Sequence, residues 1–62
     1  MSDEDEKIFA FIYGAANADD DDTVAIWLSK HVDACNLYNE SEGDDIDFYD
    51  ILGKYTEWVG EQ

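Results

Sequence analysis

The chain has 62 residues and a formal net charge of −14, which comes from 17 acidic side chains against three lysines and no arginine. A chain of this length forms one domain (residues 1–62) and buries only about 60% of its unfolded surface on folding. The charge excludes direct binding to nucleic acid or to an anionic membrane, because both require a basic surface. Hydrophobic residues still make up 45% of the chain, which excludes a disordered acidic tail and predicts a compact core.

The location of the protein is predicted from its start and its single thiol. Met1 is followed by Ser-Asp-Glu-Asp-Glu, the opposite of the positive start of a signal peptide. No apolar run approaches the ~20 residues that span a bilayer. Cys35 is the only cysteine, and a lone thiol fits a reducing interior. We therefore expect a cytoplasmic protein.

The first predicted element is a helix with Ser2 as a candidate N-cap and acidic residues in its first turn, where the helix dipole favours anions. Apolar residues then recur at i, i+3, i+4 and i+7, namely Ile8, Phe11, Ile12 and Ala15. The alternative is a strand over residues 7–13, because this stretch is short, aromatic and partly β-branched. The cap and the Ala15-Ala16 pair favour the helix, and Gly14 weakens it or marks its end.

The second predicted element is a helix that follows a small polar connection over residues 15–22. Its N-cap candidates are Thr23 and the aspartates Asp20, Asp21 and Asp22. One apolar stripe indicates a helix that ends near Asn39 or Glu40, and it comprises Val24, Trp27, Leu28, His31, Val32, Cys35 and Tyr38.

The third predicted element is a helix after the loop 41–45, in which Gly43 suits a helix end and Asp44 or Asp45 suits the next N-cap. Its apolar stripe comprises Phe48, Ile51, Leu52, Tyr55, Trp58 and Val59. Gly53 in this stretch suggests close packing, and residues 60–62 are expected to fray. The prediction is an all-α fold, a small three-helix bundle, with an α+β fold containing a strand at residues 7–13 as the alternative.

Acidic residues cluster at positions 3–6, 19–22 and 40–50. Capping and the helix dipole explain one or two acids per helix, but not four consecutive aspartates. The lysines have local candidate partners in the pairs Asp3–Lys7, Lys30–Asp33 and Asp50–Lys54. The other carboxylates have no evident partner within the chain, so the sequence predicts a basic protein as the binding partner.

The total charge is comparable with that of a short DNA duplex. Duplex DNA carries one charge per ~1.7 Å of its axis, so 14 excess charges correspond to about 24 Å of duplex. A globule of 62 residues is about 27 Å across. The chain therefore carries about the charge of the DNA that it could replace.

A very small, arginine-free, aromatic-rich polyacidic chain resembles the DNA-mimic inhibitors of phages and mobile elements, which include anti-CRISPR, anti-restriction and uracil-DNA glycosylase inhibitor proteins. The resemblance covers the whole chain and rests on size and composition. It implies an inhibitor in the host cytoplasm that blocks DNA or PAM recognition by a CRISPR effector, with a restriction or DNA-repair enzyme as the alternative target. The residues implied to replace phosphates are Asp19, Asp20, Asp21, Asp22, Glu42, Asp44, Asp45 and Asp47.

Two other interpretations remain open. High acid with little lysine is also typical of a salt-adapted protein, for which the charge says nothing about partners. A regulatory adaptor that binds a basic protein without touching DNA is the third interpretation. A continuous acidic face would favour mimicry, whereas evenly spread charge would favour salt adaptation.

Metal, cofactor and catalytic sites are not predicted. Residues 17–22 resemble the start of an EF-hand loop, but Asp22 and Leu28 stand where the glycine and glutamate are required. His31 and Cys35 share a helical face, yet zinc needs four ligands and packing explains both residues. Ser29, His31 and Asp33 do not face one another on a helix, so we expect no enzyme.

The aromatic residues exceed what one small core needs, and those off the main stripes, Phe9, Tyr13 and Tyr49, are expected at the surface. Exposed aromatic rings among acids suit a protein-binding surface. A homodimer contact is the alternative use for them.

Overall fold

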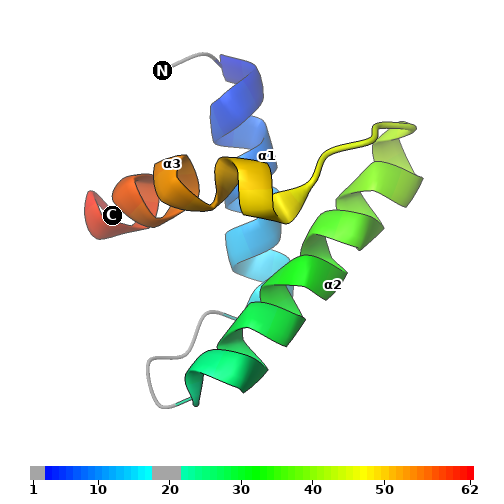
Figure 1. The fold of residues 1–62 in the computed structure, drawn as a ribbon. Coiled ribbons are helices and arrows are strands. Elements are labelled where there is room, and N and C mark those ends of the chain that lie inside the picture. The colour runs from blue at the N-terminus through cyan, green and yellow to red at the C-terminus, as the bar shows by residue number, and fades with distance from the viewer. Residues whose placement is uncertain (1–2, 18–21) are drawn as a thin grey trace.

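The computed structural model of the chain describes residues 3–17 and 22–62. Three α-helices make up the fold in these ranges: α1 (Asp3–Ala16), α2 (Val24–Glu42) and α3 (Phe48–Gly60) (Figure 1). The described residues contain no strand. The prediction of an all-α three-helix bundle is therefore confirmed, and the alternative strand at residues 7–13 is wrong. The stretch is helical because its buried side chains, Ile8, Ile12 and Ala16, recur every four residues on one helical face.

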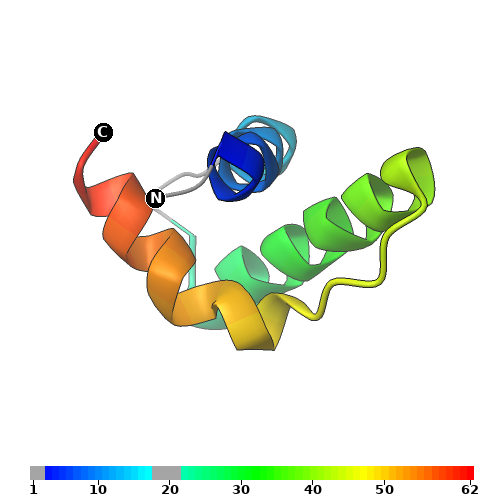
Figure 2. The ribbon, with the colours of Figure 1, turned by 90° about the horizontal axis from the view of Figure 1, so that it is seen from above.

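Helices α1 and α2 run in opposite directions, and α3 crosses in front of α1 (Figure 1). Seen from above, the three helices surround a common centre (Figure 2). The Trp27 ring near the start of α2 contacts Phe48 and Tyr55 of α3. The chain extends 30 × 24 × 19 Å and has a radius of gyration of 10.9 Å, close to the size expected for a globule of this length. The antiparallel arrangement places the start of α1 beside the end of α2.

Specific caps fix the ends of the helices. Thr23 is the N-cap of α2, and its hydroxyl accepts a hydrogen bond from the Ile26 N–H at 3.3 Å. Helix α2 ends at Glu42, two residues beyond the predicted end, because Gly43 adopts the left-handed conformation with φ of 67°. The N-cap of α3 is Asp47, whose carboxylate accepts from the Tyr49 N–H at 3.0 Å. The prediction of Asp44 or Asp45 as this cap is therefore wrong, while the Ser2 cap lies outside the described residues.

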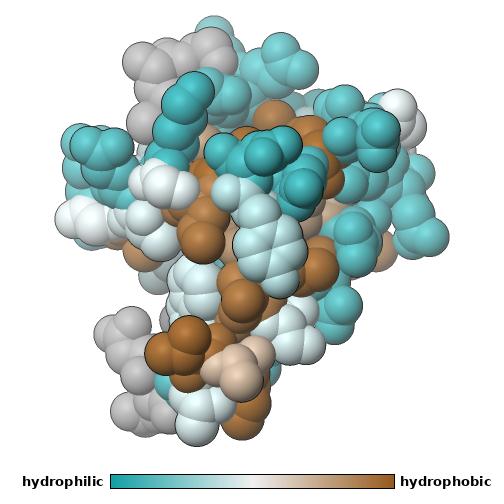
Figure 3. Space-filling model, viewed as in Figure 1, coloured by the Kyte–Doolittle hydropathy of each residue, from teal (hydrophilic) through white to brown (hydrophobic). Residues whose placement is uncertain are grey.

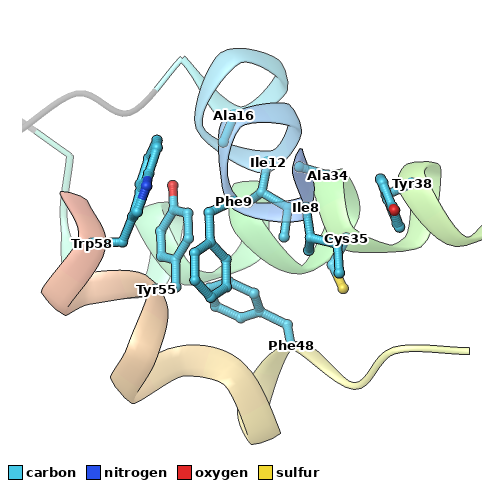
Figure 4. Close-up of a cluster of buried hydrophobic side chains, with 10 residues drawn as sticks. All are labelled: Ile8, Phe9, Ile12, Ala16, Ala34, Cys35, Tyr38, Phe48, Tyr55 and Trp58. Atoms are coloured by element: carbon cyan, nitrogen blue, oxygen red, sulfur yellow. The ribbon is translucent and has the colours of Figure 1, made fainter. Parts of the chain in front are cut away.

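Aromatic rings fill the core between the helices (Figure 4). The rings of Phe9 and Tyr55 meet edge to face with centroids 5.9 Å apart, and Phe48 packs on Tyr55 at 5.6 Å. Phe9 is almost fully buried, so the prediction that it is exposed is wrong; the predicted exposure of Tyr13 and Tyr49 is confirmed.

Three residues pack differently from what the sequence predicts. Val24 belongs to the predicted apolar stripe of α2 but is 82% exposed, because the first residue of the helix lies beyond the reach of α1 and α3. A Cβ added at Gly53 would meet no atom within 4 Å, so this glycine permits no close packing. Ala34, off the predicted stripe, is buried instead.

Candidate protein-interaction surface

One end of the molecule gathers nine carboxylates, and we call it the acidic end. It combines the first turn of α1, the last turn of α2 and the α2–α3 loop. The first turn of α1 and the last turn of α2 lie in the upper part of Figure 1, and the loop runs from there down to the start of α3. Hydrophilic atoms cover much of this upper part in Figure 3. The carboxylates of the acidic end belong to Asp3, Glu4, Asp5, Glu6, Glu40, Glu42, Asp44, Asp45 and Asp47.

An ion pair between Lys7 and Glu42 joins the two helices at the acidic end, with a distance of 3.2 Å from Nζ to the carboxylate. The hydrogen bond and charge of Glu42 raise the pKa of Lys7, with a smaller contribution from Glu4. Burial raises the pKa of the neighbouring Tyr38 phenol, and the charges of Glu42 and Asp44 add to this effect. Lys7 is thus already engaged by the carboxylate of Glu42.

The structure unites only part of the predicted binding site. Glu42, Asp44, Asp45 and Asp47 lie together at the acidic end. Asp22 lies before the first turn of α2, and since this helix has 19 residues, it is about 28 Å from Glu42 along the axis. Residues 19–21 of the predicted site lie outside the described residues.

Two of the lysines form ion pairs with residues that the sequence spacing did not predict. Lys30 donates to Asp22 at 2.6 Å rather than pairing with Asp33. Lys7 pairs with Glu42 of another helix rather than with Asp3. The predicted pairs therefore do not form, and within residues 3–17 and 22–62 Lys54 has no ion pair. Tertiary contacts override the weak preference for pairs within one helix.

Asn39 holds the acidic loop against α2. Its amide nitrogen donates to the Ile46 carbonyl at 2.8 Å, and its amide oxygen accepts from the Ile46 N–H at 2.9 Å. Sequence reasoning missed this contact. The available signal was a polar side chain near the end of the buried stripe of α2, followed by an isolated isoleucine in an acidic loop.

His31 and Cys35 are buried in the core, as packing predicts. The His31 ring stacks on Trp27 with centroids 3.9 Å apart, and Nδ1 donates to the Trp27 carbonyl at 2.7 Å. Burial and the nearby Asp47 carboxylate raise the pKa of the Cys35 thiol. No group of three or more metal-binding side chains occurs in the described part of the chain.

Comparison of the chain with protein-family models, curated proteins and solved structures finds no match. Among the described helices, none has the length and apolar character needed to cross a membrane.

Proposed function

We propose that the chain is a stoichiometric inhibitor that mimics DNA and occupies the basic nucleic-acid-binding site of a CRISPR effector, so that target DNA and its PAM are not recognised. The observation that carries the proposal is the acidic end, where three segments of the chain supply nine carboxylates and Lys7 pairs with Glu42. Capping accounts for Asp47 alone among the carboxylates of the loop.

The chemistry of such a target suits carboxylates as well as phosphates. Guanidinium groups form paired hydrogen bonds with either anion, and PAM recognition in effectors of the Cas9 type depends on arginines that contact bases. The protein supplies these anions without arginine of its own. Attraction over long range would make association fast and sensitive to salt.

The distribution of charge supports an interaction role over salt adaptation. A salt-adapted surface would carry its acids evenly, whereas nine of the fourteen described carboxylates belong to the acidic end. A restriction or DNA-repair enzyme offers the same kind of basic site, and it is therefore the alternative target in the test.

The test is a competition for DNA. A purified CRISPR effector complex binds a fluorescent duplex that contains its PAM, and the chain is added while fluorescence anisotropy reports the bound duplex. We expect displacement at a ratio of one chain per effector. Restriction and repair enzymes with their own duplexes form parallel arms. Formation of a complex that leaves DNA affinity unchanged in every arm would overturn mimicry.

Two matched double variants locate the contact. Asp44→Asn with Asp45→Asn removes two charges from the acidic end, and the Asp44 hydrogen bond to the Asp45 N–H can persist. Glu57→Gln with Glu61→Gln removes two exposed charges from the end of α3 and its C-cap. Charges in close contact with the partner contribute most to the binding energy. We therefore expect the first variant to weaken inhibition about tenfold and the second much less. Equal effects would mean that total charge, rather than the acidic end, drives binding.

A further inference from the structure

A groove of about 400 Å³ lies between one face of α2 and the start of α3. It is lined by Ala25, Leu28, Ser29, Val32, Asp33 and Tyr49. On the face shown in Figure 3, apolar surface extends from the middle of the molecule towards the beginning of α2, below the hydrophilic upper end. The groove uses the first half of α2, whereas the acidic end uses its last turn, so the two surfaces are distinct.

Most of the groove lining consists of apolar side chains of α2 and the Tyr49 ring, and these are only partly covered. Leu28 and Val32 pack against the core with one side and remain half-buried, while Ala25 is exposed. Tyr49 forms the opposite wall and is 60% exposed. A tyrosine ring at a groove edge offers a large contact area at a low entropy cost, which is typical of binding hot spots.

The charges at the groove specify the kind of partner. Asp33 lines it, is exposed and forms no ion pair with a described residue. A second copy of the chain would bring another charge of −14 to this carboxylate, which opposes a homodimer at this face. A partner with lysine or arginine beside its apolar side chains would match both the apolar lining of the groove and its negative charge.

We propose that this groove docks a basic amphipathic helix of the target protein. The lining of α2 extends from Ala25 to Asp33, about 12 Å, which accommodates two apolar side chains one helical turn apart. A basic residue flanking these anchors reaches Asp33. The inference rests on the proposed function for its basic partner, and it adds an apolar contact that DNA itself does not make.

The test uses a defined probe. An 18-residue helical peptide of leucine and lysine carries its leucines on one face, and a control peptide of the same composition spreads them around the helix. Both are titrated into the isotope-labelled full chain, with NMR shifts as the measurement. We expect the amphipathic peptide to bind about tenfold tighter, with the largest shifts at Leu28, Val32 and Tyr49.

Two variants separate the groove from general hydrophobicity. Tyr49→Ala removes one wall and should abolish most of the preference for the amphipathic peptide. Leu37→Ala is the matched control, since Leu37 is 51% exposed on α2 outside this groove, and it should retain the preference. Equal binding of the two peptides, equal effects of the two variants, or shifts confined to the acidic end would overturn the proposal.

Sedimentation of the chain alone tests whether a second copy of the chain occupies the groove. Self-association that Tyr49→Ala abolishes would assign the groove to a second copy and overturn the proposal. The DNA competition assay distinguishes the two proposals. If the chain prefers the amphipathic peptide but does not displace DNA, the groove is upheld and mimicry is rejected. If the chain displaces DNA, Tyr49→Ala displaces it equally and neither peptide is preferred, then mimicry is upheld and the groove is rejected.

Discussion

The side chain of Asn39 pairs with both backbone groups of Ile46, at 2.8 and 2.9 Å, as a neighbouring strand would. Asn39→Ala would leave the partly buried N–H and carbonyl of Ile46 without these partners. We expect the free energy of unfolding to fall by about 2 kcal/mol. Chemical denaturation followed by circular dichroism measures this change.

Asn36→Ala is the matched control for this prediction, because Asn36 is an exposed asparagine on the same helix. Its effect should stay within about 0.5 kcal/mol. Similar unfolding free energies for the two variants would mean that the Asn39 contact does not hold the loop in solution.

Two glycine-to-alanine substitutions should have opposite signs. Gly43 has a φ of 67°, which strains any residue with a Cβ, so Gly43→Ala should cost about 1 kcal/mol. Gly53 lies inside α3 with open space around it, so Gly53→Ala should stabilise the fold by about 0.5–1 kcal/mol. Thermal melting of both variants measures the shifts; changes of the same sign would contradict the assigned backbone conformations.

The buried hydroxyl of Tyr55 should make the free energy of unfolding depend on pH in the alkaline range. This hydroxyl has no hydrogen-bond partner within the described residues, and burial raises its pKa from 10 to about 12. The stability contributed by the neutral phenol is complete below the unfolded pKa and is lost as pH rises through the folded pKa. We therefore expect stability to fall between pH 10 and about 12.

Tyr55→Phe should reduce this alkaline loss and change stability at pH 8 by less than about 1 kcal/mol, since it removes an unpartnered polar group. Tyr38, whose pKa is also raised, accounts for a residual slope. Denaturant midpoints across this pH range measure the effect, and Tyr49→Phe, which changes an exposed ring, is the control. An identical slope in Tyr55→Phe would contradict the role assigned to Tyr55.

Salt should stabilise the folded chain only modestly. Repulsion among carboxylates weakens as the screening length shrinks to about 8 Å at physiological ionic strength, so the melting temperature should rise up to that point. We expect a cooperative melt already at about 10 mM salt. A chain that folds only in multimolar salt would instead be salt-adapted, and circular dichroism distinguishes the two outcomes.

The helices were predictable because capping residues and apolar periodicity act locally. Thr23 and Gly43 both mark helix ends at positions that sequence reasoning named as candidates. The periodicity of α1 wrongly predicted that Phe9 is exposed, since a helix that packs against two neighbours buries more than one stripe. Which stripe is buried depends on how α3 crosses α1.

The candidate site was less predictable because it depends on tertiary contacts. Lys7 and Glu42 are distant in sequence and meet because α1 and α2 are antiparallel. The same long helix that unites Glu42 with α1 separates it from Asp22. The groove beside Tyr49 depends on the angle between two helices, which no local pattern specifies.

Because Cys35 is buried, the rate at which its thiol is modified reports how often the fold opens. The side chain is 1% exposed, and its raised pKa keeps the reactive thiolate scarce. An alkylating reagent can therefore modify it only in molecules that have opened. Oxidants cannot crosslink two folded copies through this sulfur, so folded copies stay unlinked when the redox state of the solution changes.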